Sequence, residues 1–312
     1  MTVMDFSAGT AEAARSAFGS VITAIVTPFD NRGDLDENGI PALTQWLTQP
    51  GWNDGLVVNG TTGESLTTSD LEKTAMVRQV KESVGDRDVK VIAGVGAGDT
   101  RHSVTMATAA AAQGADALLV VAPYYSRPSQ QGILEHFLAI ADSTPLPVML
   151  YDIPKRTGIA IEPETFAAAA EHPRILAVKD AKGDLESTSW VMRHTDLAYY
   201  SGDDALNLPL LSIGAVGFVS VVGHEVANRL RDLLDCYAQG RVTEAADIHR
   251  ELLPVYRGMF RAPAAASVKA ALGFRGLPGG PVRLPLVGLS DEERTLLSSD
   301  LAAVRAPSSQ SV

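Results

Sequence analysis

Residues 147–179 read PVMLYDIPKRTGIAIEPETFAAAAEHPRILAVK, and this stretch decides the fold. It begins and ends with short apolar runs, Pro147–Tyr151 and Ile175–Lys179, which have the length and composition of buried strands. Between them, Pro163–Glu171 combines an early proline with an alanine-rich run, as helices often do. Strand, helix and strand in this order predict a βαβ unit, whose two strands lie parallel in one sheet.

The same unit recurs along the chain. Its strands are continuously apolar, which is typical of a parallel sheet covered by helices. The eight strand-like runs are Val21–Val26, Gly55–Asn59, Val89–Gly94, Ala117–Ala122, Pro147–Tyr151, Ile175–Lys179, Ala198–Ser201 and Val216–Val222. Eight units within about 250 residues predict a (β/α)8 TIM barrel. An open doubly wound sheet is the alternative, because counting strands does not prove closure.

The pattern divides the 312 residues into four parts. We expect an N-terminal segment over 1–18 and the barrel over 19–228. Residues 229–306 have a mostly helical pattern with glycine and proline breaks, so they predict a helical C-terminal extension. Residues 307–312 are predicted to form a disordered tail.

Composition narrows the classes of function. A formal net charge of −11 argues against a nucleic-acid partner and against an anionic membrane, since both attract basic surfaces. The single cysteine, Cys236, fits a reducing compartment, and the N-terminus has no signal-peptide pattern, so we expect a cytoplasmic protein. The six histidines are scattered without metal-ligand spacing, which makes a metal-dependent aldolase an unfavourable hypothesis.

Lys179 is the first candidate for chemistry. Among seven lysines it alone ends an apolar strand run, at the end of a barrel where active sites of this fold are built. Burial there lowers the pKa of an amine and leaves more of the neutral form to attack a carbonyl group. From its position alone, a structural lysine paired with Asp180 is an equally good interpretation.

Three further features follow neighbouring strands. Gly60-Thr-Thr-Gly-Glu-Ser65 offers a tight turn with two hydroxyl groups, although a turn that merely caps the next helix is the plain alternative. Tyr151 ends a strand, where its phenol can move protons beside Lys179. Arg156 lies on the adjoining loop, and its forked guanidinium suits a substrate carboxylate, although a surface arginine is the default for such a position.

Taken in order, these motifs resemble those of the dihydrodipicolinate synthases, in the pyruvate-dependent class I aldolase family that includes N-acetylneuraminate lyase. The resemblance runs over nearly the whole chain. The residues that carry it are Thr23-Ala-Ile-Val-Thr-Pro-Phe29, Gly60-Thr-Thr-Gly-Glu-Ser65, Pro123-Tyr-Tyr-Ser-Arg-Pro128, Tyr151-Asp-Ile-Pro-Lys-Arg-Thr-Gly158, Val178-Lys-Asp180, Ser201-Gly-Asp-Asp204 and Val282-Arg-Leu-Pro-Leu286. Ala264-Ala-Ala-Ser-Val-Lys269 departs from the family's usual Asn-Pro-x-Pro-Val-Lys, which we expect to affect packing rather than chemistry.

The resemblance implies a condensation of pyruvate with L-aspartate 4-semialdehyde to 4-hydroxy-tetrahydrodipicolinate, in the diaminopimelate and lysine pathway. It needs no metal or organic cofactor, because Lys179 forms a Schiff base with pyruvate. Thr61, Tyr151 and Tyr125 match the proton relay of the family, in which Tyr125 comes from a neighbouring subunit. Thr62 matches the residue that contacts the pyruvate carboxylate, and Arg156 matches the residue that contacts the semialdehyde carboxylate. Gly202 and Val219 match positions whose backbone lines the pocket.

Two alternatives remain at this point. One is a related aldolase for a sugar acid, of the N-acetylneuraminate lyase or 2-keto-3-deoxy sugar acid type, against which Arg156 and the Thr61-Thr62 pair argue. The other is a barrel that has lost catalysis and only binds a ligand. The resemblance also implies a homotetramer built from two tight dimers, and Tyr124-Tyr125 on a loop favours a subunit contact.

Feedback inhibition by L-lysine is expected to be weak. In inhibited relatives the effector lies beside the segments 60–65 and 94–100. The positions here that correspond to its polar contacts hold Asp70, Lys73, Gly98 and His102. Gly98 lacks an amide side chain, and an inward-pointing Lys73 would repel the ammonium group of the effector.

Overall fold

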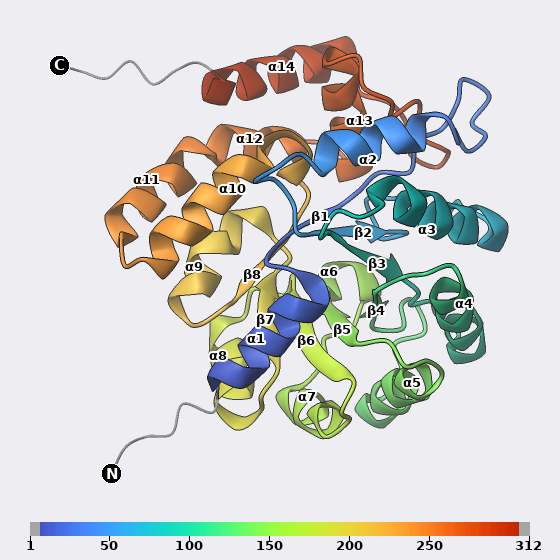
Figure 1. Ribbon diagram of the computed structural model, residues 1–312, viewed down its shortest axis with the longest axis vertical. Coiled ribbons are helices and arrows are strands. Elements are labelled where there is room, and N and C mark those ends of the chain that lie inside the picture. The colour runs from blue at the N-terminus through green and yellow to red at the C-terminus, as the bar shows by residue number, and fades with distance from the viewer. Residues whose placement is uncertain (1–6, 306–312) are drawn as a thin grey trace.

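The structure, a computed structural model, describes residues 7–305, and within them eight parallel strands form a closed barrel (Figure 1). Each strand is hydrogen-bonded to the next in chain order, and the eighth returns to the first. The strands are β1 (Val21–Ala24), β2 (Gly55–Val58), β3 (Lys90–Gly94), β4 (Ala117–Val121), β5 (Val148–Asp152), β6 (Ile175–Asp180), β7 (Ala198–Ser201) and β8 (Gly217–Ser220). The predicted TIM barrel is confirmed, and the open sheet is excluded.

Strand side chains alternate between the barrel interior and the surrounding helices, as the two-residue period of a strand requires. On β5, Met149 and Tyr151 belong to the interior cluster, whereas Val148 and Leu150 pack in the outer layer. On β6, Ala177 points inward and Val178 outward, which places Lys179 on the interior side. Tyr151 and Lys179 are also partners in the register of the two strands.

Helices cover the barrel from outside, and side-chain caps fix where several of them begin. Ser69 forms a capping box with Glu72, and the Asp99 carboxylate accepts two backbone N–H groups of the next turn. The helices of this layer are α2 (Gly39–Leu47), α3 (Asp70–Val84), α4 (Thr100–Ala112), α5 (Gln130–Asp142), α6 (Pro154–Thr157), α7 (Pro163–Ala170), α8 (Leu185–His194), η1 (Asp204–Leu206), α9 (Asn207–Ser212) and α10 (Gly223–Ala238).

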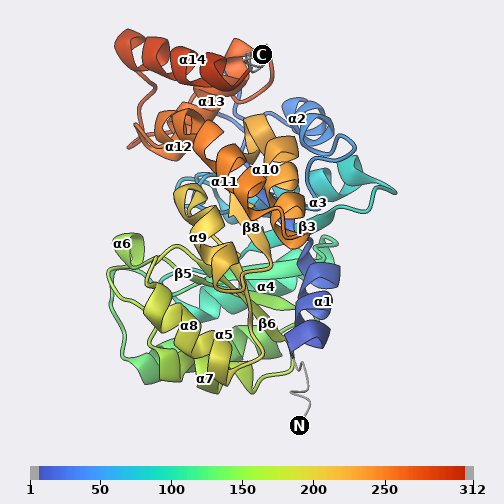
Figure 2. The same cartoon turned by 90° about the vertical axis from the view of Figure 1, so that its left-hand side faces the viewer.

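The N-terminal helix closes the bottom of the barrel. Helix α1 (Ser7–Phe18) contacts β3, β6 and β7 (Figure 2). The fully buried Phe18 ring packs edge-on against Tyr200, with ring centroids 6.3 Å apart. The Tyr200 hydroxyl donates to the Gly19 carbonyl at 2.9 Å. The opposite, carboxyl end of the strands therefore holds the open mouth.

The C-terminal region forms a helical cap beside the barrel, seen in orange and red in Figure 2. It contains α11 (Val242–Glu251), α12 (Leu253–Met259), α13 (Ala264–Phe274) and α14 (Asp291–Arg305). The predicted helical extension is confirmed, and a non-helical segment between α13 and α14 runs back to the mouth of the barrel. The predicted tail, 307–312, lies outside the described residues, and the four-part division of the chain stays a prediction.

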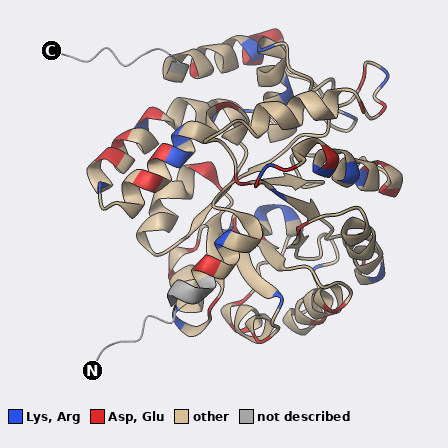
Figure 3. Ribbon diagram, viewed as in Figure 1, with Lys and Arg blue, Asp and Glu red and all other residues tan. Residues whose placement is uncertain are grey.

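No helix among residues 7–305 has the length and apolar character needed to cross a lipid bilayer. Charged residues lie mainly on the outer helices and loops (Figure 3). A charged side chain that points into the barrel is therefore conspicuous, and Lys179 is one.

Candidate active site

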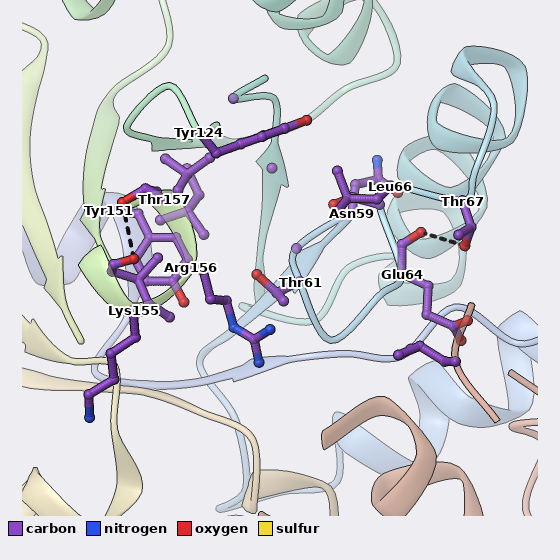
Figure 4. A pocket seen from close by; sticks show the side chains of 18 of the residues that line it. Asn59, Thr61, Glu64, Leu66, Thr67, Tyr124, Tyr151, Lys155, Arg156 and Thr157 are labelled. Carbon is purple, nitrogen blue, oxygen red and sulfur yellow. Dashed lines mark hydrogen bonds between the residues drawn. The ribbon is translucent and has the colours of Figure 1, made fainter. Parts of the chain in front are cut away.

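A cavity of about 420 Å³ opens at the carboxyl end of the strands (Figure 4). Its wall comes from the turn after β2, the ends of β3, β4 and β5, helix α6 and the segment between α13 and α14. The lining residues include Thr61, Glu64, Tyr124, Tyr151, Lys155, Arg156, Pro285 and Leu286. Three of the predicted site residues, Thr61, Tyr151 and Arg156, are among them.

Lys179 lies directly behind this cavity. Its Nζ is 4.2 Å from the centroid of the Tyr151 ring, and the residue is 5% exposed. Burial lowers the pKa of Lys179 to about 8, because the low-dielectric interior disfavours the charged form. The negative charge of Asp204 opposes this shift, and the positive charge of Arg156 adds to it. A substantial fraction of the amine is therefore neutral near physiological pH.

Tyr151 and Thr61 form the proton-bearing part of the site. Burial raises the pKa of Tyr151 to about 12, while the charge of Arg156 and a hydrogen bond with Thr61 partly offset the effect. The phenol is therefore protonated at neutral pH and works as a hydrogen-bond donor. Figure 4 shows the Arg156 side chain extending from α6 toward Thr61, whereas Lys155 points away from both.

The end of β7 keeps the space around the amine open. A Cβ atom at Gly202 would lie 2.8 Å from Cγ and 2.9 Å from Cε of Lys179, so only glycine fits without displacing the lysine. Asp204, two residues on, is 2% exposed. Its carboxylate accepts hydrogen bonds from the backbone N–H groups of Val221 and Val222 at 3.0 and 3.1 Å. This holds a buried negative charge fixed with respect to Lys179.

Two predicted contacts occupy supporting positions. Val219 is fully buried on β8, in the same interior cluster as Tyr151. Thr62 is 5% exposed and lies in the turn beside Thr61, although it does not line the cavity itself. The structure therefore brings Lys179, Tyr151, Thr61, Arg156 and Gly202 together, with Thr62 and Val219 adjacent.

Tyr125 is the one predicted site residue that stands apart. Its side chain is 96% exposed and its backbone φ is +70°, a conformation that turns the residue away from the cavity of its own chain. The neighbouring Tyr124 lines the cavity instead. Of the three residues predicted for the proton relay, Thr61 and Tyr151 line the cavity of their own chain.

Some residues of the cavity were not anticipated from sequence. Pro285 and Leu286 reach it from the C-terminal region, and Glu64 lines it from the turn after β2. Glu64 forms a 2.6 Å ion pair with Lys269 of α13. The motif Gly60-Thr-Thr-Gly-Glu-Ser65 includes Glu64, but nothing in the local sequence pattern identifies Lys269 as its partner. In chemical terms, the site combines an amine whose pKa is lowered toward neutrality, a protonated phenol, a hydroxyl and a guanidinium.

The comparisons with known proteins agree. A family model described as the dihydrodipicolinate synthetase family matches residues 17–304. A protein of Streptomyces coelicolor named 4-hydroxy-tetrahydrodipicolinate synthase 2 is 55% identical over 289 residues, which are 93% of this chain and 96% of the relative. The dihydrodipicolinate synthase of Cyanidioschyzon merolae, solved with lysine bound, is 40% identical with a TM-score of 0.90, covering 92% of this chain and 98% of that one. A Bacillus anthracis dihydrodipicolinate synthase is 42% identical with a TM-score of 0.88, covering 91% and 98%.

Gly202→Ala tests the geometry around the amine. The added methyl group meets the Lys179 side chain at 2.8 Å, so we expect the amine to be displaced and its reaction with a small keto acid to slow by about a hundredfold. The measurement is the rate of covalent trapping by borohydride. Gly273→Ala is the control, since nothing lies within 4 Å of its Cβ position. Equal trapping rates in the two variants would contradict the packing argument.

Proposed function

We propose that this chain, which belongs to the dihydrodipicolinate synthetase family, condenses pyruvate with L-aspartate 4-semialdehyde to 4-hydroxy-tetrahydrodipicolinate. The family match over residues 17–304 and the 55% identity to a named synthase favour this reaction over a sugar-acid aldolase or an inactive binding barrel. The observation that carries the proposal within the structure is the buried amine of Lys179, 4.2 Å from the Tyr151 ring behind a cavity that Arg156 lines.

The first step is formation of a Schiff base. The neutral Nζ of Lys179 attacks the keto carbon of pyruvate, and the carbonyl oxygen leaves as water after it has gained two protons. Tyr151 and Thr61 pass these protons. Thr62 holds the pyruvate carboxylate beside the turn, and Gly202 and Val219 line the space that the bound pyruvate occupies. The bond to Lys179 is covalent, so no organic cofactor and no metal enters the scheme.

The second step makes and uses a carbon nucleophile. Loss of a methyl proton to the relay of Tyr151 and Thr61 converts the Schiff base into an enamine. The enamine carbon attacks the aldehyde carbon of the semialdehyde while the aldehyde oxygen takes a proton from the relay. Arg156 holds the carboxylate of this second substrate through its fork of N–H donors. The amino group of the semialdehyde then attacks the former keto carbon, closes the ring and displaces Lys179 as the free amine.

The third member of the relay comes from a second copy of the chain. Tyr125 is exposed, and two large apolar residues near the same mouth are exposed with it, Leu66 at 75% and Leu284 at 78%. Aromatic and apolar side chains gathered in this way are typical of an interface core. A homotetramer of two tight dimers, placed in the cytoplasm, completes the proposal.

Pyruvate with borohydride is expected to add covalent mass at Lys179. Lys269 is an internal rival, because burial lowers the pKa of this second lysine also to about 8, but its amine is paired with Glu64. The trapping rate should rise with pH through about 8 as Lys179 loses its proton. Peptide mass spectrometry locates the adduct, and a condensation assay with L-aspartate 4-semialdehyde against sugar acids tests the reaction. An adduct elsewhere, or turnover of sugar acids only, contradicts the proposal.

Arg156→Ala should impair use of the semialdehyde while pyruvate trapping stays close to that of the wild type. Losing a charged hydrogen-bond donor corresponds to roughly 10- to 100-fold in kcat/KM for the second substrate. Arg156→Lys keeps the positive charge but lacks the forked guanidinium. Its kcat/KM for the semialdehyde should therefore lie between those of the wild type and Arg156→Ala. The contact is misassigned if pyruvate trapping and semialdehyde use decline together.

Tyr125→Phe removes one hydroxyl group and should lower turnover by about a hundredfold without changing the sedimentation coefficient. Subunit mixing gives a sharper measurement. Lys179→Ala and Tyr125→Phe chains are each impaired alone, but a mixed dimer contains one site with both groups intact. Mixed oligomers should therefore regain activity. An active monomer, or mixtures without recovery, would show that Tyr125 does not act across an interface.

Feedback inhibition by L-lysine should require more than about a millimolar effector. The Asp70 carboxylate already contacts His102 Nε2 at 3.0 Å, and the Lys73 ammonium donates to the Thr68 carbonyl at 3.0 Å. Neither side chain is thus available without breaking an existing contact. Titration of the initial rate with lysine measures the effect, with the Cyanidioschyzon merolae protein as the positive control. Half-inhibition well below a millimolar would contradict this expectation.

A further inference from the structure

We propose that Glu64 and Lys269 are positioning residues, which hold the turn after β2 so that Thr61 stays in reach of Tyr151 for proton transfer. The inference rests on the proposed function, because it assigns a task to the proton relay of that site. Neither Glu64 nor Lys269 touches the reacting atoms, and the two residues lie in different elements of the fold.

The ion pair between them is almost completely removed from water. Lys269 Nζ lies 2.6 Å from Glu64 Oε1, with 3% and 1% of the two side chains exposed. The same ammonium donates to the Pro281 carbonyl at 2.8 Å. Two charges this deeply buried are retained only where each has a close partner, since an isolated charge is strongly disfavoured there. Rotating either side chain away is therefore costly, and the contact is rigid.

The turn is held a second time by Arg283. Its backbone N–H donates to the other carboxylate oxygen, Glu64 Oε2, at 2.8 Å. Its guanidinium donates to the Thr67 carbonyl at 2.8 Å. Lys269 and Arg283 both lie 4.0 Å from the ring centroid of Phe29. The turn is thus anchored to the C-terminal region at Glu64 and Thr67.

The anchor is connected to Thr61 by a single backbone hydrogen bond. The Glu64 N–H donates to the Thr61 carbonyl at 3.1 Å, and Glu64 has a φ of +57°, which a non-glycine residue seldom adopts. On the other side, the Thr27 hydroxyl donates to the Gly63 carbonyl at 2.6 Å. The side-chain contacts of Glu64 keep this uncommon backbone conformation, and the conformation sets where Thr61 stands. Thr61 and Tyr151 line the same cavity.

A second ion pair provides a matched control for a purely structural role. Arg275 Nε, at the end of α13, lies 2.8 Å from Glu225 Oε2 of α10, and the Glu225 side chain is 1% exposed. This pair also fastens the C-terminal region to the barrel through a buried glutamate, but neither residue lines the cavity. Glu225→Gln and Glu64→Gln therefore remove the same charge from equally buried sites.

The experiment compares two reactions that need pyruvate alone. Borohydride trapping reports Schiff-base formation, and loss of the methyl signal of pyruvate in D2O, followed by NMR, reports enamine formation. Both reactions pass protons through the relay, so for Glu64→Gln we expect both to be slower than in the wild type by roughly 10- to 100-fold, the effect of a small misplacement. Glu225→Gln should keep both rates while its melting temperature falls. Wild-type rates in Glu64→Gln, or an equal loss of both rates in Glu225→Gln, overturn the proposal.

Three further variants keep the test decisive if Glu64→Gln does not fold. Lys269→Met removes the other charge, and the double variant Glu64→Gln, Lys269→Met should lose no more exchange than either single variant, because the pair acts as a unit. Thr27→Val removes the opposite anchor of Gly63 and should slow both exchange and trapping. Additive losses in the double variant contradict the paired role. Because semialdehyde is absent throughout, a failed condensation assay would not imitate any of these outcomes.

Discussion

An amine attacks a carbonyl group only as the neutral base, and the constraint that favours this form of Lys179 is its removal from water. An ammonium group inside a closed barrel has few dipoles to solvate it, so burial moves its pKa to about 8. The rest of the fold maintains that condition. Helix α1 closes one end of the barrel with Phe18, and the eight strands leave no open edge through which water reaches the interior. Substrate approaches from the mouth, where the cavity lies.

Lys179 and Lys269 show that burial alone does not make a nucleophile. Burial lowers the pKa of both amines to about 8. Lys269 has a carboxylate at 2.6 Å and a carbonyl at 2.8 Å, so its donors are occupied and it fastens two parts of the chain. Lys179 instead faces the ring of Tyr151, which lines the cavity, and the charges of Asp204 and Arg156 act on its pKa in opposite directions. The difference lies in what surrounds each nitrogen.

Local periodicity allowed the barrel to be predicted, together with the placement of Lys179 and Tyr151 at strand ends, whereas Thr62, Gly202 and Val219 were proposed only from the resemblance to the family. Lys179 and Tyr151 each end an apolar run, and parallel strands in register bring such ends together. The contacts of Glu64 with the C-terminal region could not be predicted. Its hydrogen bond with Arg283, for example, spans 219 positions of the chain, and no repeating pattern encodes it. Tyr125 was expected to act from a neighbouring subunit, which stays a prediction, and its positive φ is a backbone feature that composition does not reveal. Long-range anchors and backbone conformation were therefore the parts that needed a structure.

Strand ends and turns differ in how their positions are fixed, and the site depends on both. Lys179 and Tyr151 belong to a ladder of backbone hydrogen bonds that is continuous around the barrel, so their Cα positions are set by the sheet. Thr61 follows β2 in a turn, where no ladder continues and where glycines loosen the backbone. The precision that a relay needs must come there from side chains, and Thr27, Lys269 and Arg283 supply them. The C-terminal region lies outside the barrel, yet it fixes the least constrained member of the site.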